Sequence, residues 1–364
     1  MPQAGNPFAN IKPNVVNENL EAHSFIFYGK GKLGKTTIAS NFPKSVILEF
    51  ERGGDCIPGL MRLPVNSWDE FENQIEYLKD PWTKENFRMI VIDTADKMID
   101  LAKEKVRVNY NNKLKLKNTD KNGVVGNYKK ADSFRDINDN GGEWEEVEKL
   151  VGRALDRIYK YYGYGIILIV HSKEKADPKN KEKKEIVFNM NERYMTLLNN
   201  VVDLVCYIQN EEVEIDGTKQ IVPMIYYRGT ETFFAGSRFK FIQNKSQFTY
   251  LDIENAIKTA IKVEKEVVGN EFFTDEEKEL LEDPQIEEEF KKCCEYIKNI
   301  TKFLSINFKQ HPTMPFDSFW YPQIQKVISD RIGEKKLSEL TKENLTEAAD
   351  IAREIQALVK RYRN

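Results

Sequence analysis

The residues best suited to chemistry lie between Gly29 and Thr36, where the sequence reads GKGKLGKT. This run has the spacing G-x-x-x-x-G-K-T, follows an apolar β-favouring run and precedes residues that continue as a helix, which is typical of a P-loop. Its backbone N–H groups and the helix start attract phosphate. We expect a nucleotide site formed by Gly29, Lys30, Gly31, Lys32, Leu33, Gly34, Lys35, Thr36 and Thr37.

Three side chains are expected to act on the phosphates and their metal ion. Lys35 would reach the β- and γ-phosphates, and the hydroxyl of Thr36 would bind Mg²⁺. Asp93 ends the apolar run 87–93, which is the Walker B pattern, and its carboxylate would orient the ligands of Mg²⁺. The sequence therefore predicts ATP and Mg²⁺ as cofactors, with Lys35 and Asp93 among the catalytic residues.

Hydrolysis also requires a carboxylate that orients or deprotonates the attacking water. The position after Asp93 is Thr94, so this carboxylate must come from elsewhere. Glu49 and Glu51, on the apolar run after the P-loop helix, are the candidates, and residues two apart on a strand face the same side. Glu51 lies nearer the carboxyl end and is the predicted catalytic residue, with Glu49 as the alternative.

Two further residues could contact the nucleotide. His171 ends the apolar run 165–171, where a polar side chain could touch the γ-phosphate and report its presence to the segment that follows. Arg238 follows Gly236-Ser237 and could contact a phosphate in a neighbouring subunit, although an ordinary surface arginine is an equal alternative.

The elements that must position these residues are short apolar strands alternating with helices. Strands are expected at 23–29, 45–50, 87–93 and 165–171, with helices between them. Such strands form a mostly parallel sheet buried on both faces, which is an α/β fold. Ligands bind at the carboxyl ends of parallel strands, so the P-loop, Glu51 and Asp93 should converge there.

Composition sets limits on the class of protein. The chain has 364 residues, a formal net charge of −3, and 31% charged residues, so any polyanion site must be a local patch. Its 4 cysteines form no C-x-x-C pair, and no apolar run is long enough to cross a membrane. We expect a cytoplasmic protein, in the host cytoplasm if the chain is phage-encoded.

The chain is expected to divide into four parts. Residues 1–20 resemble a flexible arm, and residues 21–269 form the nucleotide-binding core. The acidic segment 270–289 would be a linker, and residues 290–364 a helical C-terminal domain.

Two lysine-rich segments, at 107–142 and 172–185, interrupt the core and are predicted to be loops. Lysines that follow a phosphate backbone bind nucleic acid without sequence preference, and aromatic residues such as Tyr110, Tyr128 and Phe134 could stack on bases. The expected DNA-binding residues are Lys113, Lys115, Lys117, Lys129, Lys130, Lys173 and Lys175. A solvated surface without a ligand is the alternative.

Together, the P-loop, the run Glu49-Phe50-Glu51, Asp93-Thr94 and His171-Ser172-Lys173 resemble the RecA-like ATPase core. Within that class the chain is most similar to the phage proteins of the Sak-type single-strand annealing group, and the stretch FFAGSRF at 233–239 looks like the same group. The resemblance covers residues 20–260. It implies that the segments 107–142 and 172–190 face the centre of a ring or filament and contact single-stranded DNA. The first of these is longer than that pattern requires, and the region after 270 has no counterpart in it.

Three functions are therefore open. The first is a phage recombination ATPase that binds single-stranded DNA and promotes annealing or strand exchange. The second is a replicative helicase or helicase loader on the same core. The third is an ATP-dependent oligomeric scaffold with little hydrolysis. In each, a homo-oligomer is expected, and a single-strand-binding or other replication protein is a possible partner.

Overall fold

The computed structural model shows a chain that separates into two units, Met1–Leu281 and Glu282–Asn364, which are treated one at a time below. The structure describes residues 13–120, 123–137, 140–176, 184–215, 218–276, 284–310, 313–333, 335–341 and 344–363.

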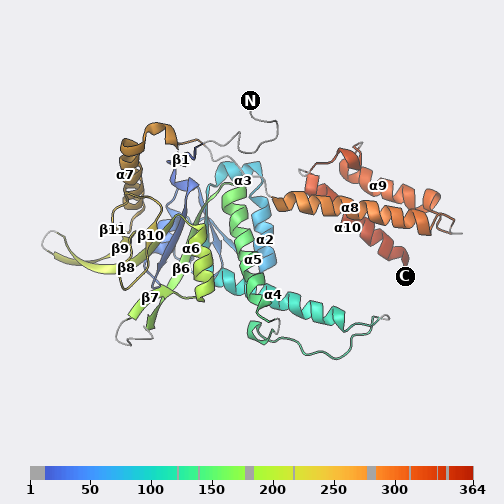
Figure 1. The fold of residues 1–364 in the computed structure, drawn as a ribbon, viewed down its shortest axis with the longest axis horizontal. Helices are drawn as coiled ribbons and strands as arrows, with labels where there is room; N and C mark the ends of the chain where they lie inside the picture. The colour runs from blue at the N-terminus through green and yellow to red at the C-terminus, as the bar shows by residue number, and fades with distance from the viewer. Residues whose placement is uncertain are drawn as a thin grey trace. The chain divides into compact units, whose positions relative to one another are not determined.

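The larger unit is built on one mostly parallel sheet (Figure 1). The strand order is β11-β9-β8-β2-β6-β5-β3-β4, in which the β8–β9 and β9–β11 pairs are antiparallel and the other pairs are parallel. One strand, β6, separates the P-loop strand β2 from β5, which carries Asp93. The strands are β2 Ser24–Gly29, β3 Ser45–Glu49, β4 Arg62–Pro64, β5 Met89–Asp93, β6 Gly165–Ala176, β8 Leu204–Ile215, β9 Thr218–Tyr226, β10 Gly236–Ser237 and β11 Lys245–Gln247.

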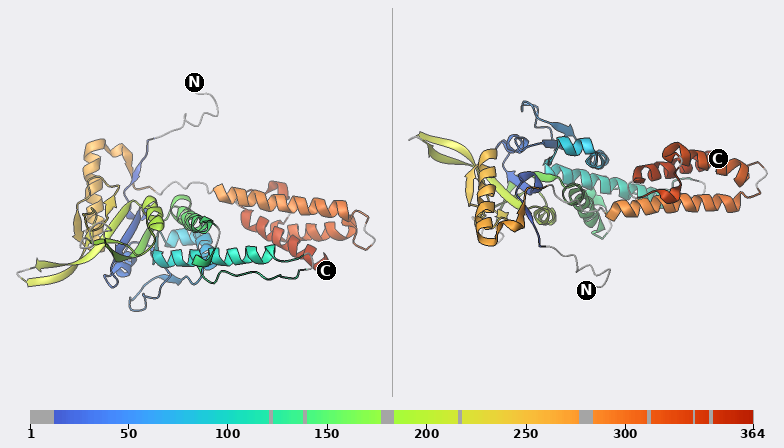
Figure 2. Two further views of the ribbon diagram at one scale, coloured as in Figure 1. Left: turned by 60° about the horizontal axis from the view of Figure 1, so that its bottom comes forward. Right: turned by 90° about the horizontal axis from the view of Figure 1, so that it is seen from above.

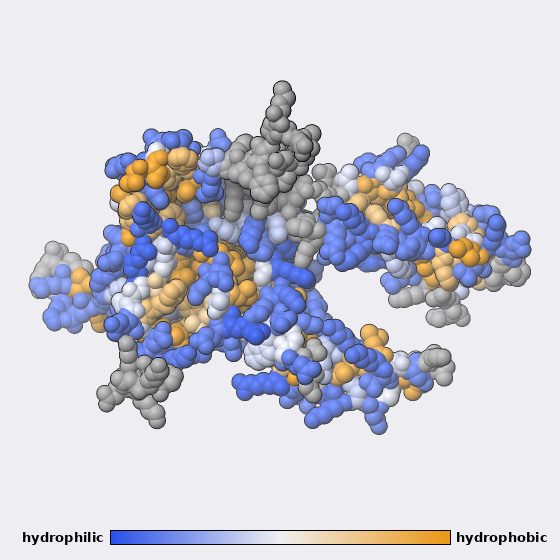
Figure 3. Space-filling model, viewed as in Figure 1, coloured by the Kyte–Doolittle hydropathy of each residue, from blue (hydrophilic) through white to orange (hydrophobic). Residues whose placement is uncertain are grey.

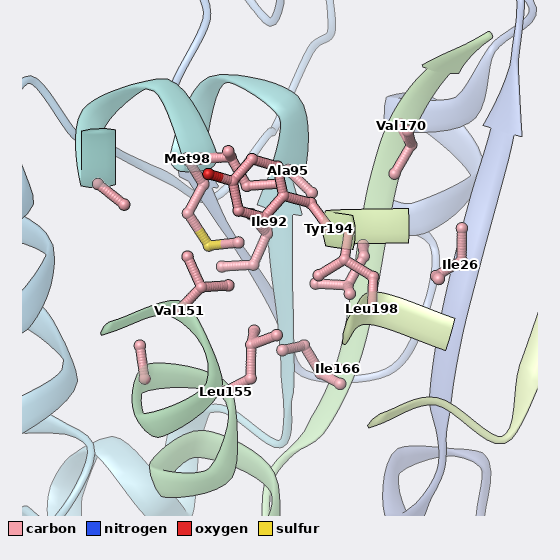
Figure 4. Packing of buried hydrophobic residues seen from close by; sticks show 14 of the residues in the cluster. Ile26, Ile92, Ala95, Met98, Val151, Leu155, Ile166, Val170, Tyr194 and Leu198 are labelled. Atoms are coloured by element: carbon pink, nitrogen blue, oxygen red, sulfur yellow. The ribbon is translucent and has the colours of Figure 1, made fainter. Parts of the chain in front are cut away.

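Helices cover both faces of this sheet. The side chains of β2 alternate, so that Ile26 and Tyr28 join one hydrophobic cluster and Phe25 and Phe27 join the other. Figure 4 shows the first cluster, where Ile26 and Ile92 of the sheet lie near helical residues such as Leu198. The helices are α1 Lys35–Ser40, α2 Trp68–Tyr77, α3 Pro81–Asn86, α4 Ala95–Lys117, α5 Gly142–Asp156, α6 Glu192–Val201 and α7 Tyr250–Val268. The predicted α/β class with a mostly parallel sheet is confirmed.

The first lysine-rich segment is partly helical, contrary to the prediction of a loop over 107–142. Helix α4 continues to Lys117, so Lys113, Lys115 and Lys117 lie on its last turns. Its buried residues end at Val106, but leucine and lysine favour continuation of the helix, and lysines suit a helix C-terminus. The last turns of α4 extend away from the sheet in both views of Figure 2.

The second lysine-rich segment begins as a β-hairpin rather than a loop. Strand β6 runs on to Ala176 and pairs with β7, Lys184–Phe188, so Lys173 and Lys175 lie on a strand. The last three residues of β7 are apolar, and Val187 and Phe188 are buried. Residues 177–183 lie outside the described part of the chain.

The predicted arm and linker both contribute to the larger unit. Strand β1, Val16–Asn17, pairs with β12, Phe273–Thr274, and Leu20 is buried. Helix α8 already begins at Pro284, inside the predicted linker. The predicted arm and the predicted linker are therefore structured at these positions, because β1 and β12 pair with each other.

The smaller unit is helical, as predicted for the C-terminal region. Its helices are α8 Pro284–Asn307, α9 Tyr321–Ile332 and α10 Leu345–Arg363, with a π-helical turn at Phe316–Trp320. Trp320, Ile324, Ile351 and Ile355 form its buried core. In the described residues of both units, no helix is long and apolar enough to cross a membrane.

Candidate nucleotide-binding site

The P-loop connects the end of β2 to the start of α1, as its sequence predicts. Gly29 lies between β6 and β8, and a Cβ atom there would be only 2.4 Å from the carbonyl oxygen of Ile208. Gly34, directly before α1, has a φ of 81°, which L-residues with side chains rarely adopt. Both glycines are thus required by the backbone path that brings the loop back over the strand end.

Lys35 is held inside the loop. Its Nζ donates hydrogen bonds to the carbonyl oxygens of Gly29 at 3.1 Å and Lys30 at 2.6 Å. Burial lowers the pKa of Lys35 to about 8, although the carboxylates of Asp93 and Asp96 act in the opposite direction. The amine is therefore poised at the base of the loop, where an incoming phosphate would favour its charged form.

Thr36 and Asp93 are in direct contact. The Thr36 hydroxyl donates a 2.7 Å hydrogen bond to Oδ2 of Asp93, which is only 7% exposed. Burial raises the pKa of Asp93, while the bond from Thr36 and the charge of Lys35 oppose that rise. A hydroxyl and a carboxylate side by side are hard oxygen ligands, so these two residues fit Mg²⁺.

A pocket of about 580 Å³ opens over these residues, which is within the usual size of ligand pockets. The predicted residues that line it are Gly31, Lys32, Gly34, Lys35, Thr36, Thr37, Glu51, Asp93 and His171. Gly29 and Lys30 contribute carbonyl oxygens that hold Lys35, and Leu33 packs against the core. The lining residues that the sequence did not single out are Arg52, Gly53, Ile57, Thr94 and Ile169.

The structure distinguishes the two candidate glutamates. Glu49 has a side chain only 9% exposed, and Arg62 Nη1 donates to its two oxygens at 2.9 and 3.1 Å. The N–H groups of Gly53 and Gly54 also donate to its Oε1, at 3.3 and 3.1 Å. Glu51 is exposed and lines the pocket. Glu51 is thus the carboxylate that is available to a water molecule in the pocket.

His171 lies at the pocket beside a residue that sequence reasoning missed. Its Nδ1 is 3.2 Å from Oδ2 of Asp96, in the first turn of α4. The bond with Asp96 raises the pKa of His171 more than burial lowers it. Ligand-type atoms of Glu51, Asp96 and His171 all lie within 4.8 Å of one another. The available signal for Asp96 was its place three residues after Asp93 at a helix start.

Arg238 is not brought to the pocket of its own chain. Its guanidinium donates at 3.0 Å to Asp203 and at 3.3 Å to the carbonyl oxygen of Asn200, next to the amino-terminal end of β8. The P-loop leaves the opposite, carboxyl end of the parallel strands. A contact between Arg238 and a nucleotide of a neighbouring subunit stays a prediction.

The lysines predicted to bind DNA are all exposed, but they occupy different settings. Lys113 pairs with Glu146 at 3.0 Å and Lys175 with Glu192 at 3.3 Å, while Lys173 donates to a backbone carbonyl. The lysines of the first segment and those of the second segment do not form one surface. The last turns of α4 and the β6–β7 hairpin leave the core in different directions (Figure 1).

The aromatic residues of the first segment are less available than predicted. Tyr110 and Phe134 pack against the hydrophobic core, and the ring of Phe134 lies 5.0 Å from that of Trp144. Both rings therefore have a packing role that the expectation of base stacking did not include. Tyr128 is half-buried.

The fold and the site define a P-loop nucleotide-binding protein. Residues 21–239 match the family described as AAA domain, and the chain belongs to that family. It is also similar to the "SPbeta prophage-derived uncharacterized protein YorG" of Bacillus subtilis (strain 168), with 28% identity over 263 residues, which is 71% of this chain and 73% of the relative.

Among solved structures, the flagellar accessory protein FlaH from Methanocaldococcus jannaschii aligns with 63% of this chain and 85% of its own. The identity is 10% and the TM-score 0.28. The assignment to the α/β class therefore depends on the sheet order and the P-loop of this chain.

Proposed function

We propose that this chain is a DNA-dependent ATPase that binds single-stranded DNA and promotes annealing or strand exchange during phage DNA replication or repair. In this proposal Lys35 binds the β- and γ-phosphates, Thr36 and Asp93 hold Mg²⁺, and Glu51 orients the attacking water. Mg²⁺ would neutralise charge on the phosphates when bound. The single observation that carries the proposal is the contact of Thr36 with Asp93 in the same pocket as Lys35 and Glu51.

The exposed lysines support the DNA part of the proposal. Lys115 and Lys117 lie on the last turns of α4, and Lys129 and Lys130 on the segment that returns toward α5. Figure 3 shows hydrophilic and hydrophobic residues side by side on this projecting part. Leu116, between Lys115 and Lys117 in the sequence, is 74% exposed. Such a surface suits a phosphate backbone, with apolar contacts available to unstacked bases.

Assembly is part of the same proposal. ATP would sit at a boundary between subunits of a ring or filament, so that binding favours assembly and hydrolysis favours release from DNA. Arg238 would contact the phosphates of the adjacent subunit, and the C-terminal helices are available to a single-strand-binding or other replication protein. The similarity to a prophage-derived protein is consistent with a phage setting.

The first test is ATP hydrolysis with and without single-stranded DNA. We expect DNA to stimulate turnover and Lys35→Ala to abolish it, because the phosphates lose their cation. Lys258→Ala, an exposed lysine of α7, is the matched control and should change neither rate. Wild-type turnover in Lys35→Ala, together with no stimulation by DNA, would remove the proposal.

The second test is the salt dependence of single-stranded DNA binding. Replacing Lys115, Lys117, Lys129 and Lys130 with alanine should reduce the slope of log affinity against log salt, by roughly 0.7 for each lost phosphate contact. The paired change Lys258→Ala with Lys262→Ala on α7 is the control. Annealing of complementary strands by the wild type supports the proposed activity, whereas directional unwinding of a forked duplex would favour a helicase instead.

A further inference from the structure

The loop that joins β3 to β4 forms one wall of the nucleotide pocket. It contributes Glu51, Arg52, Gly53 and Ile57 to the lining. Only Glu51 has a role in the function proposed above. The loop therefore brings a second charged side chain, the guanidinium of Arg52, to the pocket without an assigned task.

The base of this loop is fixed by one buried carboxylate. Glu49, the last residue of β3, accepts hydrogen bonds from the N–H groups of Gly53 and Gly54 and from Arg62, the first residue of β4. Arg62 also donates to Asp55 within the loop. Both ends of the loop are thus tied to the same side chain.

Gly54 leaves room for the side chains that close the loop. A Cβ atom there would lie 2.4 Å from Cδ2 of Leu60 and 3.2 Å from Oε1 of Glu49, so a side chain at this position would displace at least the end of Leu60. The conformation of the loop at the pocket thus depends on this packing and on the hydrogen bonds of Glu49.

A bound triphosphate would keep about one negative charge that Mg²⁺ and Lys35 do not neutralise. A nucleoside triphosphate carries about four negative charges, of which Mg²⁺ and Lys35 neutralise about three. Arg52 is exposed, and the carboxylate whose charge interacts with it, Asp55, is itself bonded to Arg62. The guanidinium is therefore available to a phosphate, and its fork geometry suits two phosphate oxygens.

We infer that Arg52 contacts the γ-phosphate of a nucleotide bound to its own chain, and that Glu49 and Arg62 are positioning residues for this contact. The inference rests on the proposed binding of MgATP. The P-loop amides surround the inner phosphates, whereas Glu51 must stand beside the γ-phosphate to orient water. Arg52 is the neighbour of Glu51 on the same loop and lines the same pocket, so it lies at the γ-phosphate end.

The test compares the affinities of a non-hydrolysable ATP analogue and of ADP, each with Mg²⁺. Arg52→Ala should weaken binding of the analogue about 10-fold or more, as for loss of a charge-assisted hydrogen bond, and that of ADP less than about 2-fold. Arg52→Lys should fall between, because it keeps the charge but not the fork. Arg153→Ala, an exposed arginine of α5 outside the pocket lining, is the control and should change neither affinity.

The outcomes separate this inference from the proposed function. A wild type that binds the analogue, with an unchanged ratio of affinities in Arg52→Ala, would overturn the role of Arg52 alone. A wild type that binds neither nucleotide would overturn both proposals.

The positioning role needs its own variants. Arg62→Ala and Glu49→Gln should reduce discrimination between the analogue and ADP in the same direction as Arg52→Ala, and lower kcat more than they raise KM. Arg62→Lys should restore part of the discrimination because it keeps a donor for Glu49. If these variants weaken binding of the analogue and of ADP equally, Glu49 and Arg62 do not position Arg52. A lower melting temperature with unchanged discrimination between the two nucleotides would show that the pair only stabilises the fold.

Discussion

Thr36 and Asp93, which are 57 residues apart in the sequence, are joined by a 2.7 Å hydrogen bond. Thr36 lies in the first turn of α1 and Asp93 ends β5, with β6 between β5 and the P-loop strand. The two expected magnesium ligands are therefore adjacent in the fold. An ion held by both side chains would take the place of this hydrogen bond.

The first prediction concerns Asp93 and Mg²⁺. In the wild type, removal of Mg²⁺ with EDTA should weaken ATP binding by about 10-fold or more, because Thr36 and Asp93 would hold the ion and the ion would offset phosphate charge. Asp93→Asn should bind ATP with similar affinity with and without Mg²⁺, as measured by equilibrium titration. Asp132→Asn, an exposed carboxylate, serves as the control and should retain the dependence on Mg²⁺.

The second prediction separates the two glutamates. Glu51→Gln should lower kcat by about 100-fold or more and leave nucleotide affinity nearly unchanged, because it removes the group that orients water. Glu49→Gln should retain more turnover, since an amide oxygen can still accept from Gly53 and Gly54. Steady-state kinetics of the two variants measures this difference in kcat. Near-normal turnover in Glu51→Gln, with none in Glu49→Gln, would show that Glu49 orients the water instead.

The third prediction uses the pKa of Lys35, which burial lowers to about 8. A bound triphosphate favours the charged amine and so raises this pKa, which means that binding near pH 8 takes up a fraction of a proton. Calorimetry in two buffers with different ionisation enthalpies measures that uptake. Lys35→Arg should bind the nucleotide without proton uptake, because arginine is charged at every pH of the experiment. If this variant takes up as many protons as the wild type, Lys35 is not the group that is protonated.

The fourth prediction concerns pH and the pair formed by His171 and Asp96. Since the hydrogen bond with Asp96 raises the pKa of His171, the charged imidazole stabilises the fold below the ordinary pKa of about 6.5, and this contribution is lost as pH rises through the folded pKa. The melting-temperature advantage of the wild type over Asp96→Asn should therefore shrink as the pH rises from about 6.5 into the range above it. A constant difference across that range would contradict the assignment.

The fifth prediction concerns Asp203, whose side chain is 12% exposed. Burial would raise its pKa, but the nearby His23 imidazole, with Nδ1 at 3.8 Å, and the hydrogen bonds from Tyr159 and Ser24 together outweigh burial and lower it. Its contribution to stability is therefore lost only in strong acid. Asp203→Ala should cost about 2–4 kcal/mol in urea unfolding because several donors lose their acceptor.

Arg238 provides the comparison for that experiment. Its side chain is 63% exposed, so Arg238→Ala should cost less than about 1 kcal/mol. A loss of ATPase activity in Arg238→Ala, present only at protein concentrations that allow assembly, would support its contact with a neighbouring subunit. Unchanged activity at every concentration would exclude that contact.

The parts of the site that the sequence predicted are those governed by local pattern. The P-loop spacing fixes a strand, a glycine turn and a helix start, and an apolar run ending in Asp93 fixes a buried strand with a carboxylate at its end. Because the carboxyl ends of parallel strands share one edge of the sheet, the convergence of Thr36, Asp93 and Glu51 also followed.

The parts that the sequence did not predict depend on contacts between distant segments. Helix α4 extends into the segment 107–142 because lysine and leucine favour helix there, but no buried residue after Val106 marks these turns in the sequence. The hairpin after His171 was missed because β7 is recognisable only by its pairing with β6. The roles of Glu49 and Arg62 could not be inferred because no sequence pattern near either residue indicates that Arg62 donates hydrogen bonds to Glu49.

The pairing of β1 with β12 means that the first and last ordered strands of the larger unit are bound side by side, in register from Val16 with Phe273. A circularly permuted version, with these two ends joined by a short linker and new termini opened elsewhere, should keep the nucleotide pocket intact. Deleting one of the two strands would remove the hydrogen-bond partner of the other. A shortened version of the larger unit should therefore contain either both strands or neither.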